Sequence, residues 1–589
     1  MSKEVFIEKI PFTKEAIDQF RKDQLYPTKD STKFFLNYPT VYIANHTKTD
    51  KKDDKYNVYV GETSNIYFRT LQHLQRDPKD RKDWEKIVIA GDSSLYIIGH
   101  KFFNKSLTLD IENRLMLYLS SVENIDTVYN RRTNQQNEYY TSECLDRVFS
   151  QIWRGLRNID QNLFPLEEII KDSALFKASP FHKLTDEQSH AINQIKTRIK
   201  EALNTNKSKQ LILLKGAAGA GKTVVLSSLF YDLFHDEEDA DNPNKLNNKD
   251  NYLLVNHQEQ LTIYEQIARK LNPIDKKSKR VAKPTSFINH HDPDNKADVV
   301  LVDEAHLLWT QGKQSYRGEN QLKDIIDRAR VVVAVFDEDQ ILQTNQIWEE
   351  KPIKQILRDS EMTVIYLHKQ MRINSNPETL KWIRDFIDSK EINDIPKDSK
   401  FDLRIFDNPG DLEEAIRVKA QNDEKGLSRV TATYDWDYSS ASKPTYSDYW
   451  YVSEEDWKMP WNKQLIEENK EQRKKNKDLS WAEQPHTIDE VGSTYTVQGL
   501  DLNFAGVIIG PSVKYRDGRI IYDPDSSHNK NATQNRTMID GSKVKHGETL
   551  LKNELNVLLT RGVNGLYIYA VDEELRNALL NADQREDHE

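Results

Sequence analysis

The residues with the clearest chemistry in this sequence form a glycine-rich loop that ends in a lysine and a threonine. The loop, Gly216-Ala217-Ala218-Gly219-Ala220-Gly221-Lys222-Thr223, follows the apolar run 211–214 and precedes the helical pattern of 224–234. A loop between a strand and a helix can wrap its N–H groups around phosphates, and the helix N-terminus adds positive charge. We expect Lys222 to contact the β- and γ-phosphates of a nucleoside triphosphate and Thr223 to hold Mg²⁺. The glycines expected to shape this cradle are Gly216, Gly219 and Gly221.

A second strand-like segment ends in two carboxylates. Residues 299–302 are apolar, and Asp303 and Glu304 follow them directly. In a sheet parallel to the strand before the loop, Asp303 would hold Mg²⁺ through its water shell and Glu304 would orient the attacking water. The run 333–339 repeats this design and is followed by Gln340, which is placed to sense the γ-phosphate. These segments predict an ATPase site.

The composition describes a highly charged chain with one cysteine. Of its 589 residues, 30% are charged and 37% are hydrophobic, and the formal net charge is −10. This balance argues against a chain that coats polyanions over its whole surface, but it leaves room for a local basic track. Cys144 cannot form an internal disulfide, which fits a reducing compartment. The sequence lacks an apolar run of about 18 residues and a signal-peptide pattern, so we expect a soluble, cytoplasmic protein with no membrane partner.

The elements that must position these residues change in character near residue 184. Upstream, an α+β unit is expected, with strands at Thr40–Ala44, Asn57–Gly61, Lys86–Ala90 and Ser94–Gly99 and helices at Asn65–Gln75 and Leu109–Leu119. Residues 146–180 are typical of a helical connector.

Downstream, short apolar strands alternate with longer helices. The first strands are expected at Gln210–Lys215, Asn251–Asn256, Asp298–Asp303 and Arg330–Phe336, and a second set at Thr363–His368, Val507–Gly510 and Gly565–Ala570. Near-continuous Val, Leu and Ile runs of this kind favour parallel sheets that are covered on both faces. The fold class predicted for this part is therefore α/β, with two lobes.

The order of the downstream motifs resembles that of a superfamily 1 helicase, and in particular the Schlafen-group-3-like helicase domain found in many prokaryotic proteins. The segments that carry the resemblance, besides the loop and the carboxylates, are Leu184-Thr185-Asp186-Glu187-Gln188, Gln370-Met371-Arg372, Tyr495-Thr496-Val497-Gln498-Gly499-Leu500-Asp501 and Leu558-Leu559-Thr560-Arg561-Gly562. The resemblance covers roughly residues 180–575 and implies two RecA-like lobes.

The same resemblance implies roles for four of these residues. Gln188 would read adenine, and Gly499 would belong to the segment that couples nucleic acid to the ATP site. Arg372 and Arg561 would reach the γ-phosphate from the second lobe, where a guanidinium neutralises the charge of the transition state.

The upstream unit resembles a GIY-YIG nuclease domain. Thr40-Val41-Tyr42 stands at the first tripeptide and Tyr59-Val60-Gly61 at the second. The resemblance implies that Tyr42 and Tyr59 lie at the water or the scissile phosphate and that Arg69 contacts this phosphate. Further residues matched to the family pattern are His73, on the helical face of Arg69, Glu112 as the single metal ligand, and Asn130 as a late polar partner. A tyrosine base would need a lowered pKa, to which Arg69 could contribute.

The sequence departs from the nuclease pattern in two ways, because Thr40 replaces the first glycine and the insert between the two tyrosines is long. Two other hypotheses therefore stand beside a nuclease. In one, an ATP-dependent switch closes on nucleic acid or protein and the first unit only binds. In the other, a helicase carries an inactive appendage.

Together these patterns predict an ATP-dependent nuclease-helicase. The expected organisation is a GIY-YIG-like domain at 1–145, a helical connector at 146–180, a first RecA-like lobe at 181–350 and a second lobe with insertions at 351–589. The expected cofactors are ATP and Mg²⁺, with Mn²⁺ as an alternative at the nuclease site. The expected partner is nucleic acid, DNA rather than RNA, with a homo-oligomer or a protein partner left open, and the expected role is defence against foreign nucleic acid.

Overall fold

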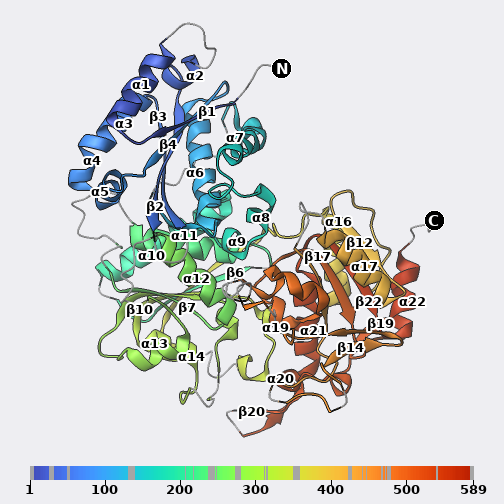
Figure 1. Cartoon of the computed structure of the whole chain (residues 1–589). Helices are drawn as coiled ribbons and strands as arrows, with labels where there is room; N and C mark the ends of the chain where they lie inside the picture. The colour runs from blue at the N-terminus through green and yellow to red at the C-terminus, as the bar shows by residue number, and fades with distance from the viewer. Residues whose placement is uncertain are drawn as a thin grey trace. The chain divides into compact units, whose positions relative to one another are not determined.

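The structure is a computed structural model that describes most of the chain (Figure 1). The described residues are 5–25, 32–49, 54–129, 139–205, 207–216, 218–235, 246, 249–271, 280–310, 312, 316–348, 358–421, 427–440, 442–445, 447–465, 469–470, 473, 479–538 and 541–583. They fall into two compact units, of which the first comprises Met1–Ser189, Ser227–Asn248 and Ile263–Arg280 and the second His190–Leu226, Lys249–Thr262 and Val281–Glu589. Among the described residues, no helix combines the length and the apolar character needed to span a bilayer.

The first unit is built on a five-stranded sheet with the order β1-β4-β2-β3-β5. Its strands are β1 (Val5–Pro11), β2 (Thr40–Thr49), β3 (Asp54–Thr63), β4 (Ser94–His100) and β5 (Ile125–Val128). All neighbours are antiparallel except β3 and β5, which are parallel. Residues 41–44 of the central strand β2 are buried on both faces of the sheet, so helices must cover both sides.

Helices lie on the two sides of this sheet in Figure 1. Those of the unit are α1 (Lys14–Gln24), α2 (Thr32–Leu36), α3 (Ile66–Gln75), α4 (Asp77–Asp80), α5 (Lys82–Ile89), α6 (Lys105–Ser121), α7 (Leu145–Ile159), α8 (Glu167–Asp172) and α9 (Ala174–Lys177). One face of the sheet packs against α1, α3 and α5 in a core that includes Ile17, Ile66 and Trp84. Helix α6 packs on β2 and β3 from the other side.

One predicted strand of this unit is wrong. Residues 86–90 fall largely within helix α5, whose buried residues Trp84 and Ile87 are three positions apart, as one face of a helix requires. A short apolar run does not by itself distinguish a strand from one turn of a buried helix. The predicted strands at 40–44, 57–61 and 94–99 and the predicted helices at 65–75 and 109–119 all lie within observed elements of the same type, apart from the cap residue Asn65.

The first sheet of the second unit is parallel throughout, with the order β11-β6-β10-β9-β7-β8. Its strands are β6 (Gln210–Gly216), β7 (Asn251–Val255), β8 (Val281–Ala282), β9 (Ala297–Asp303), β10 (Ala329–Phe336) and β11 (Glu361–Leu367). The accompanying helices are α10 (Asp186–Asn204), α11 (Lys222–His235), α12 (Gln258–Leu271), α13 (Pro284–His290) and α14 (Gln321–Asp327).

The second sheet is also parallel, with the order β12-β22-β17-β13-β16. Its strands are β12 (Asp402–Ile405), β13 (Ser428–Ala432), β16 (Gly492–Ser493), β17 (Leu502–Ile509) and β22 (Gly562–Ala570), with helices α16 (Pro377–Arg384), α17 (Pro409–Ala420), α19 (Thr494–Val497), α20 (Lys530–Thr533), α21 (Gly547–Leu559) and α22 (Glu573–Ala582). Hairpins β14–β15 (Tyr451–Glu454, Trp457–Pro460), β18–β19 (Val513–Arg516, Arg519–Tyr522) and β20–β21 (Arg536–Thr537, Lys543–Val544) are attached to it. Separate apolar cores cover its two faces, one including Val507 and the other Ile508.

The strand predicted at 363–368 belongs to the first sheet and not to the second set. Strand β11 pairs in parallel with β6 over seven residues, from Glu361 opposite Gln210 to Leu367 opposite Gly216. The order of the strands along the chain suggested that this strand belongs to the second lobe. Its position at the edge of the first sheet results from pairing with β6, which is distant in the sequence. One consequence is that the segment after β11 begins next to the glycine-rich loop.

The buried centre of β9 should be essential for the fold of the second unit. Leu301 has no exposed surface, whereas Leu25 in the first unit is 63% exposed. We expect Leu301→Ala to lower the stability of the second unit by about 2–5 kcal/mol, because it leaves a cavity in a close-packed sheet. Differential scanning calorimetry would measure the shift of the unfolding temperature. Leu25→Ala is the control, and an equal shift for both variants would contradict the packing described for β9.

Candidate active sites

The three central strands of the first sheet bring separate polar residues to one edge. Strand β10 pairs with β6 on one side and with β9 on the other. Because parallel strands end at the same edge of a sheet, the residues that follow them meet there. These residues are Lys222 at the start of α11, Asp303 at the end of β9, and Asp337 after β10. The prediction that the loop lysine and the strand-end carboxylates share an edge is therefore confirmed.

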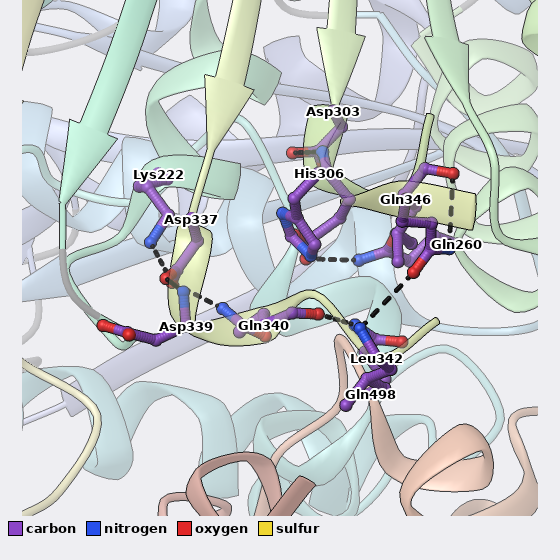
Figure 2. Close-up of polar contacts among 12 residues, drawn as sticks. Lys222, Gln260, Asp303, His306, Asp337, Asp339, Gln340, Leu342, Gln346 and Gln498 are labelled. Carbon is purple, nitrogen blue, oxygen red and sulfur yellow. Dashed lines mark hydrogen bonds and ion pairs between the residues drawn. The ribbon is translucent and has the colours of Figure 1, made fainter. Parts of the chain in front are cut away.

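The loop lysine is held by an ion pair across this edge (Figure 2). Lys222 Nζ lies 2.9 Å from Asp337 Oδ2 and also donates to the carbonyl of Gly216, and the side chains of Lys222 and Asp337 are 7% and 5% exposed. Burial would raise the pKa of Asp337, but the charges of Lys222 and His306 and the hydrogen bonds from Gln340 and Lys222 outweigh it and lower the pKa. Asp337 is thus an ionised partner of the lysine, and it is a residue to which the sequence analysis gave no role.

The glycines of the loop are required by its conformation and by its neighbours. Gly219 and Gly221 have positive φ angles of 83° and 77°, which favour glycine. A Cβ atom at Gly216 would lie 2.6 Å from the carbonyl oxygen of Leu367, and one at Gly219 would lie 2.6 Å from the Cβ atom of Arg372. Thr223, predicted to hold Mg²⁺, is half-buried directly after Lys222. Ala217 lies outside the described residues.

The two strand-end carboxylates are buried and joined to each other. Asp303 is 1% exposed and Glu304 is 7% exposed, and the Glu304 N–H donates to Asp303 Oδ1 at 3.0 Å. Gln260 Nε2 donates to Glu304 Oε1 at 3.1 Å, and His306 Nε2 lies 3.3 Å from Glu304 Oε2. Burial would raise the pKa of Glu304, but His306, Lys222, the Gln260 hydrogen bond and Arg561 together lower it. Glu304 is therefore held as a carboxylate, as an orienting group for water requires.

Arg561 of the second sheet's lobe reaches this network through Gln340. Its Nη2 donates to Gln340 Oε1 at 2.8 Å, and Gln340 Nε2 donates to Asp337 Oδ2 at 2.7 Å. Burial, and next to it the charge of Arg372, lower the pKa of Arg561 to about 9. A continuous chain of hydrogen bonds thus runs from the loop lysine to Arg561.

The second predicted arginine is held by a carboxylate of its own lobe. Arg372 Nε lies 2.5 Å from Asp501 Oδ1, and the neighbouring Met371 N–H donates to the Gly219 carbonyl at 2.9 Å. Two guanidinium groups close enough to repel each other mark a position that an anionic phosphate would stabilise. Arg372 lies beside the glycine-rich loop, because a Cβ atom at Gly219 would lie 2.6 Å from its Cβ, and the role of both arginines at the γ-phosphate stays a prediction.

Two residues of the site, Gln260 and Asp337, carried no clear signal in the sequence, and residues of the predicted motif 495–501 lie against the same network. Gln498 Nε2 donates to the Gln340 carbonyl at 3.0 Å. Gly499 has a φ of 80° and lies very close to Gln260, because a Cβ atom at Gly499 would be 2.4 Å from the Nε2 atom of Gln260. In the sequence, Gln260 is an amide in a helical segment and Asp337 is an aspartate in an acidic run, and both patterns are typical of surface residues. In the fold both side chains are buried.

Gln188, predicted to read adenine, lies in the first unit. Its side-chain oxygen accepts from the N–H of Thr185 at 3.0 Å, and the Thr185 hydroxyl accepts from the Gln188 N–H at 3.3 Å. These reciprocal bonds form a capping box at the start of α10. The adenine-reading role stays a prediction.

The candidate nuclease residues form a second cluster, in the first unit. Tyr42 Oη lies 2.7 Å from His73 Nε2, and His73 Nδ1 lies 2.5 Å from Asp77 Oδ2. A carboxylate only accepts, so His73 carries its proton on Nδ1 and its Nε2 accepts from the tyrosine hydroxyl. Arg69 Nε also donates to this hydroxyl, at 3.4 Å.

The residues around this chain fix its geometry. The His73 ring stacks on Trp84 with 3.6 Å between ring centroids, and Tyr59 lies 6.1 Å from Tyr42 in a stacked arrangement. A Cβ atom at Gly61 would lie 2.4 Å from the Tyr42 ring, so only glycine fits there. Glu112 on α6 is buried, and its charge contributes to the pKa of both tyrosines. Asn130 lies outside the described residues.

Neither tyrosine has the lowered pKa that a tyrosine base would need. Burial raises the pKa of Tyr42 well above its usual value, and it raises that of Tyr59 as well. The charge of Arg69 acts in the expected direction but is outweighed. Burial also lowers the pKa of His73 to about 3, so the imidazole is neutral. A neutral imidazole accepts the hydrogen bond of the Tyr42 hydroxyl, but a pKa this low makes it a weak base.

Arg561 should be needed for turnover of the predicted nucleotide and not for its binding. We expect Arg561→Lys to lower kcat for ATP hydrolysis by roughly 10³-fold, because a lysine does not reproduce the planar fork that stabilises the transition state. Phosphate release and the binding of a fluorescent ATP analogue would be measured together. Arg536→Lys is the matched control, since Arg536 is also buried and donates to the Thr344 carbonyl. Equal losses in both variants would contradict this role.

Comparisons with known proteins identify the domain that holds the two parallel sheets. The family model described as "Schlafen group 3, DNA/RNA helicase domain" matches residues 209–572. The chain is also 32% identical to the uncharacterized protein YPL245W of Saccharomyces cerevisiae over 471 residues, which cover 74% of this chain and 98% of the yeast protein.

Two helicase structures show a distant similarity. The Pif1 helicase from Candida albicans has a TM-score of 0.21 and 11% identity, over 41% of this chain and 55% of that chain. The DUF1998 helicase MrfA, bound to DNA and AMPPNP, has a TM-score of 0.27 and 11% identity, over 71% of this chain and 52% of that chain. The chain therefore spans about half the length of each helicase structure. The family match covers more than half of the sequence, and the chain belongs to the Schlafen group 3 DNA/RNA helicase domain family.

Proposed function

We propose that this protein joins a metal-dependent endonuclease to its helicase domain, and that ATP hydrolysis gates or feeds the cleavage of phosphodiester bonds. The observation that carries the nuclease half is the buried chain from Asp77 through His73 to the hydroxyl of Tyr42. Arg69 donates to the same hydroxyl. A hydroxyl, a neutral imidazole and a guanidinium in one cluster can move a proton beside a phosphate and balance its charge.

In the helicase domain, the residues at the sheet edge suit ATP hydrolysis. Lys222 would leave Asp337 to contact the phosphates, and Thr223 and Asp303 are oxygen donors suited to Mg²⁺. Glu304 would orient the attacking water, and Gln340 would report the γ-phosphate to Arg561, to which it is bonded. Arg372 and Arg561 would neutralise the transition state from the second lobe. Gly499, next to Gln498, would relay nucleic-acid binding to this edge.

At the nuclease site, Tyr42 would accept a hydrogen bond from the attacking water while its own O–H donates to His73, and Asp77 would keep the imidazole in the required tautomer. Arg69 would bind the scissile phosphate. Tyr59, stacked beside Tyr42, would line the same position, and Asn130 remains a predicted polar partner. The proton path therefore uses residues of β2 and α3.

The donor type of Glu112 fits a hard divalent cation. It is a buried carboxylate whose charge acts on Tyr42 and Tyr59. Within the part of the chain that the structure describes, no group of three or more His, Cys, Asp or Glu is arranged to hold a metal. An ion at Glu112 would keep several waters, as Mg²⁺ does, and Mn²⁺ could replace it. When bound, the ion would supply positive charge to the phosphate.

Nucleic acid is the proposed partner, DNA in preference to RNA, and the proposed setting is the cytoplasm. The pairing of a nuclease with a helicase supports defence against foreign nucleic acid, by analogy between domain combinations. A second candidate function is an ATP-dependent switch whose first unit binds without cleaving. The replacement of the first motif glycine by Thr40 and the raised pKa of both tyrosines favour this second candidate.

The nuclease residues should be needed for metal-dependent cleavage. We expect Glu112→Ala to abolish cleavage of DNA in Mg²⁺, because the metal loses its protein ligand. We expect Tyr42→Phe to slow cleavage by roughly 10²–10⁴-fold, the range of a lost proton-transfer group. Cleavage of labelled single- and double-stranded DNA and RNA would be followed on gels with Mg²⁺ or Mn²⁺.

Asp18→Asn is the control for these variants. Asp18 accepts a hydrogen bond from Tyr67 on the same helix as His73, but it has no place in the chain that ends at Tyr42. Cleavage that survives in Glu112→Ala would refute the assignment of the nuclease site. A wild-type protein that hydrolyses ATP without cleaving any substrate would favour the switch.

ATP hydrolysis should control cleavage. We expect Lys222→Ala to eliminate phosphate release, because the lysine that contacts the phosphates is lost, and to change the ATP dependence of cleavage while the nuclease cluster stays intact. The measurement is cleavage with and without ATP in wild type and variant. Identical cleavage in both proteins under both conditions would show that the two activities are independent.

A further inference from the structure

Gln260 occupies a position that the ATPase motifs do not explain. It lies in the first turn of α12 and is 5% exposed. Its Nε2 donates to Glu304 Oε1 at 3.1 Å. Its Oε1 is buried and, among the described residues, has no hydrogen-bond partner. Figure 2 shows Gln260 beside the residues that follow β9 and β10.

A buried amide oxygen without a hydrogen-bond partner is unfavourable, so a hydrogen-bond donor is expected beside it. Nearly all buried polar groups in folded proteins are hydrogen-bonded, so an orphaned acceptor indicates a group that binds there. The same amide fixes one oxygen of Glu304, and His306 lies next to the other. A donor at Gln260 Oε1 would therefore stand beside the carboxylate that orients water. Water has the two donors that this pair of acceptors requires.

The other side of Gln260 is closed by the second lobe. A Cβ atom at Gly499 would lie 2.4 Å from Gln260 Nε2 and 2.9 Å from its Cδ. The residues on either side of Gly499 are also tied to the site, because Gln498 donates to the Gln340 carbonyl and Arg561 donates to the Leu500 carbonyl. A movement of residues 498–500 would change the position of the Gln260 amide and, through it, of Glu304.

We propose that Gln260 is the positioning residue for the attacking water and the link through which residues 498–500 control hydrolysis. Its Nε2 fixes Glu304, and its Oε1 accepts one O–H of the water while Glu304 accepts the other. The water oxygen bonds to the γ-phosphorus, and the bond from that phosphorus to the β–γ bridging oxygen breaks. One water proton passes to Glu304 and then to the released phosphate, which leaves ADP and inorganic phosphate. This inference rests on the proposed hydrolysis of ATP at Lys222 and Glu304.

The test replaces the amide in the full-length protein. We expect Gln260→Leu to lower kcat for phosphate release by roughly 10–100-fold, because the water and Glu304 lose their orientation. Gln260→Glu should be at least as slow, since a second carboxylate repels Glu304. The dissociation constant of a fluorescent ATP analogue should stay within about twofold in both, because Gln260 acts on the chemical step and not on binding.

Gln346→Leu is the matched control. Gln346 is 3% exposed, bonds to the Leu342 N–H and to the Leu307 carbonyl, and lies in the same view of the site. It should keep kcat near wild type at a temperature below its unfolding midpoint. Gln260→Leu hydrolysing at the rate of this control, or losing ATP binding as strongly as kcat, would overturn the proposal.

Gly499→Ala tests the link to the second lobe. We expect single-stranded DNA to stimulate phosphate release severalfold in the wild type and hardly at all in this variant, with unchanged DNA binding. Stimulation that persists at the wild-type ratio would overturn the coupling. Lys222→Ala separates this inference from the proposed function: if the wild type releases no more phosphate than Lys222→Ala, the ATPase itself fails, and the role of Gln260 falls with it.

Discussion

The buried charge of Lys222 is the constraint on which the helicase domain's site depends. A lysine removed from water needs an anion and hydrogen-bond acceptors, because an unpaired buried charge is strongly destabilising. Asp337 and the Gly216 carbonyl meet this need. Asp337 is in turn bonded to Gln340, and Gln340 to Arg561. The charge of Lys222 is therefore compensated by a chain of hydrogen bonds that begins at the first sheet and ends in the second lobe, at Arg561.

In the first unit, the buried polar group that needs a hydrogen-bond partner is an uncharged hydroxyl and not a lysine. The hydroxyl of Tyr42 is buried, and a neutral imidazole accepts from it while Asp77 holds the imidazole. Burial raises the pKa of both tyrosines and keeps their hydroxyls protonated. A protonated hydroxyl needs a hydrogen-bond acceptor, and the His73 imidazole meets this need, which the positive charge of Arg69 cannot do. The close approach of Gly61 to the Tyr42 ring and the stacking of Trp84 on His73 leave these side chains little freedom. Such fixed orientation is a general requirement of proton transfer.

Prediction from sequence succeeded where the signal was local. Three elements show this: the strand before the glycine-rich loop, the strand that ends at Asp303, and the helix that carries Arg69 and His73. Each has a hydrophobic periodicity or a terminal residue pattern that can be recognised within a short stretch of sequence. It failed at Lys86–Ala90, where one turn of a buried helix has the same apolar content as a strand. It also failed to assign strand β11 to the first sheet, because pairing with β6 depends on residues about 150 positions away.

The sequence by itself determined the chemistry on offer: a phosphate-binding loop, two carboxylates after a strand, two arginines in later motifs, and a tyrosine, arginine and histidine set near the N-terminus. Residue types and short spacings suffice for this, because each motif is a strand or helix terminus. Tertiary structure alone decided that Asp337 pairs with Lys222, that Asp77 holds His73, and that Gln260 stands between Glu304 and Gly499. These contacts depend on which strand ends lie side by side and on what burial does to a polar group, and neither is encoded in any short stretch of the chain.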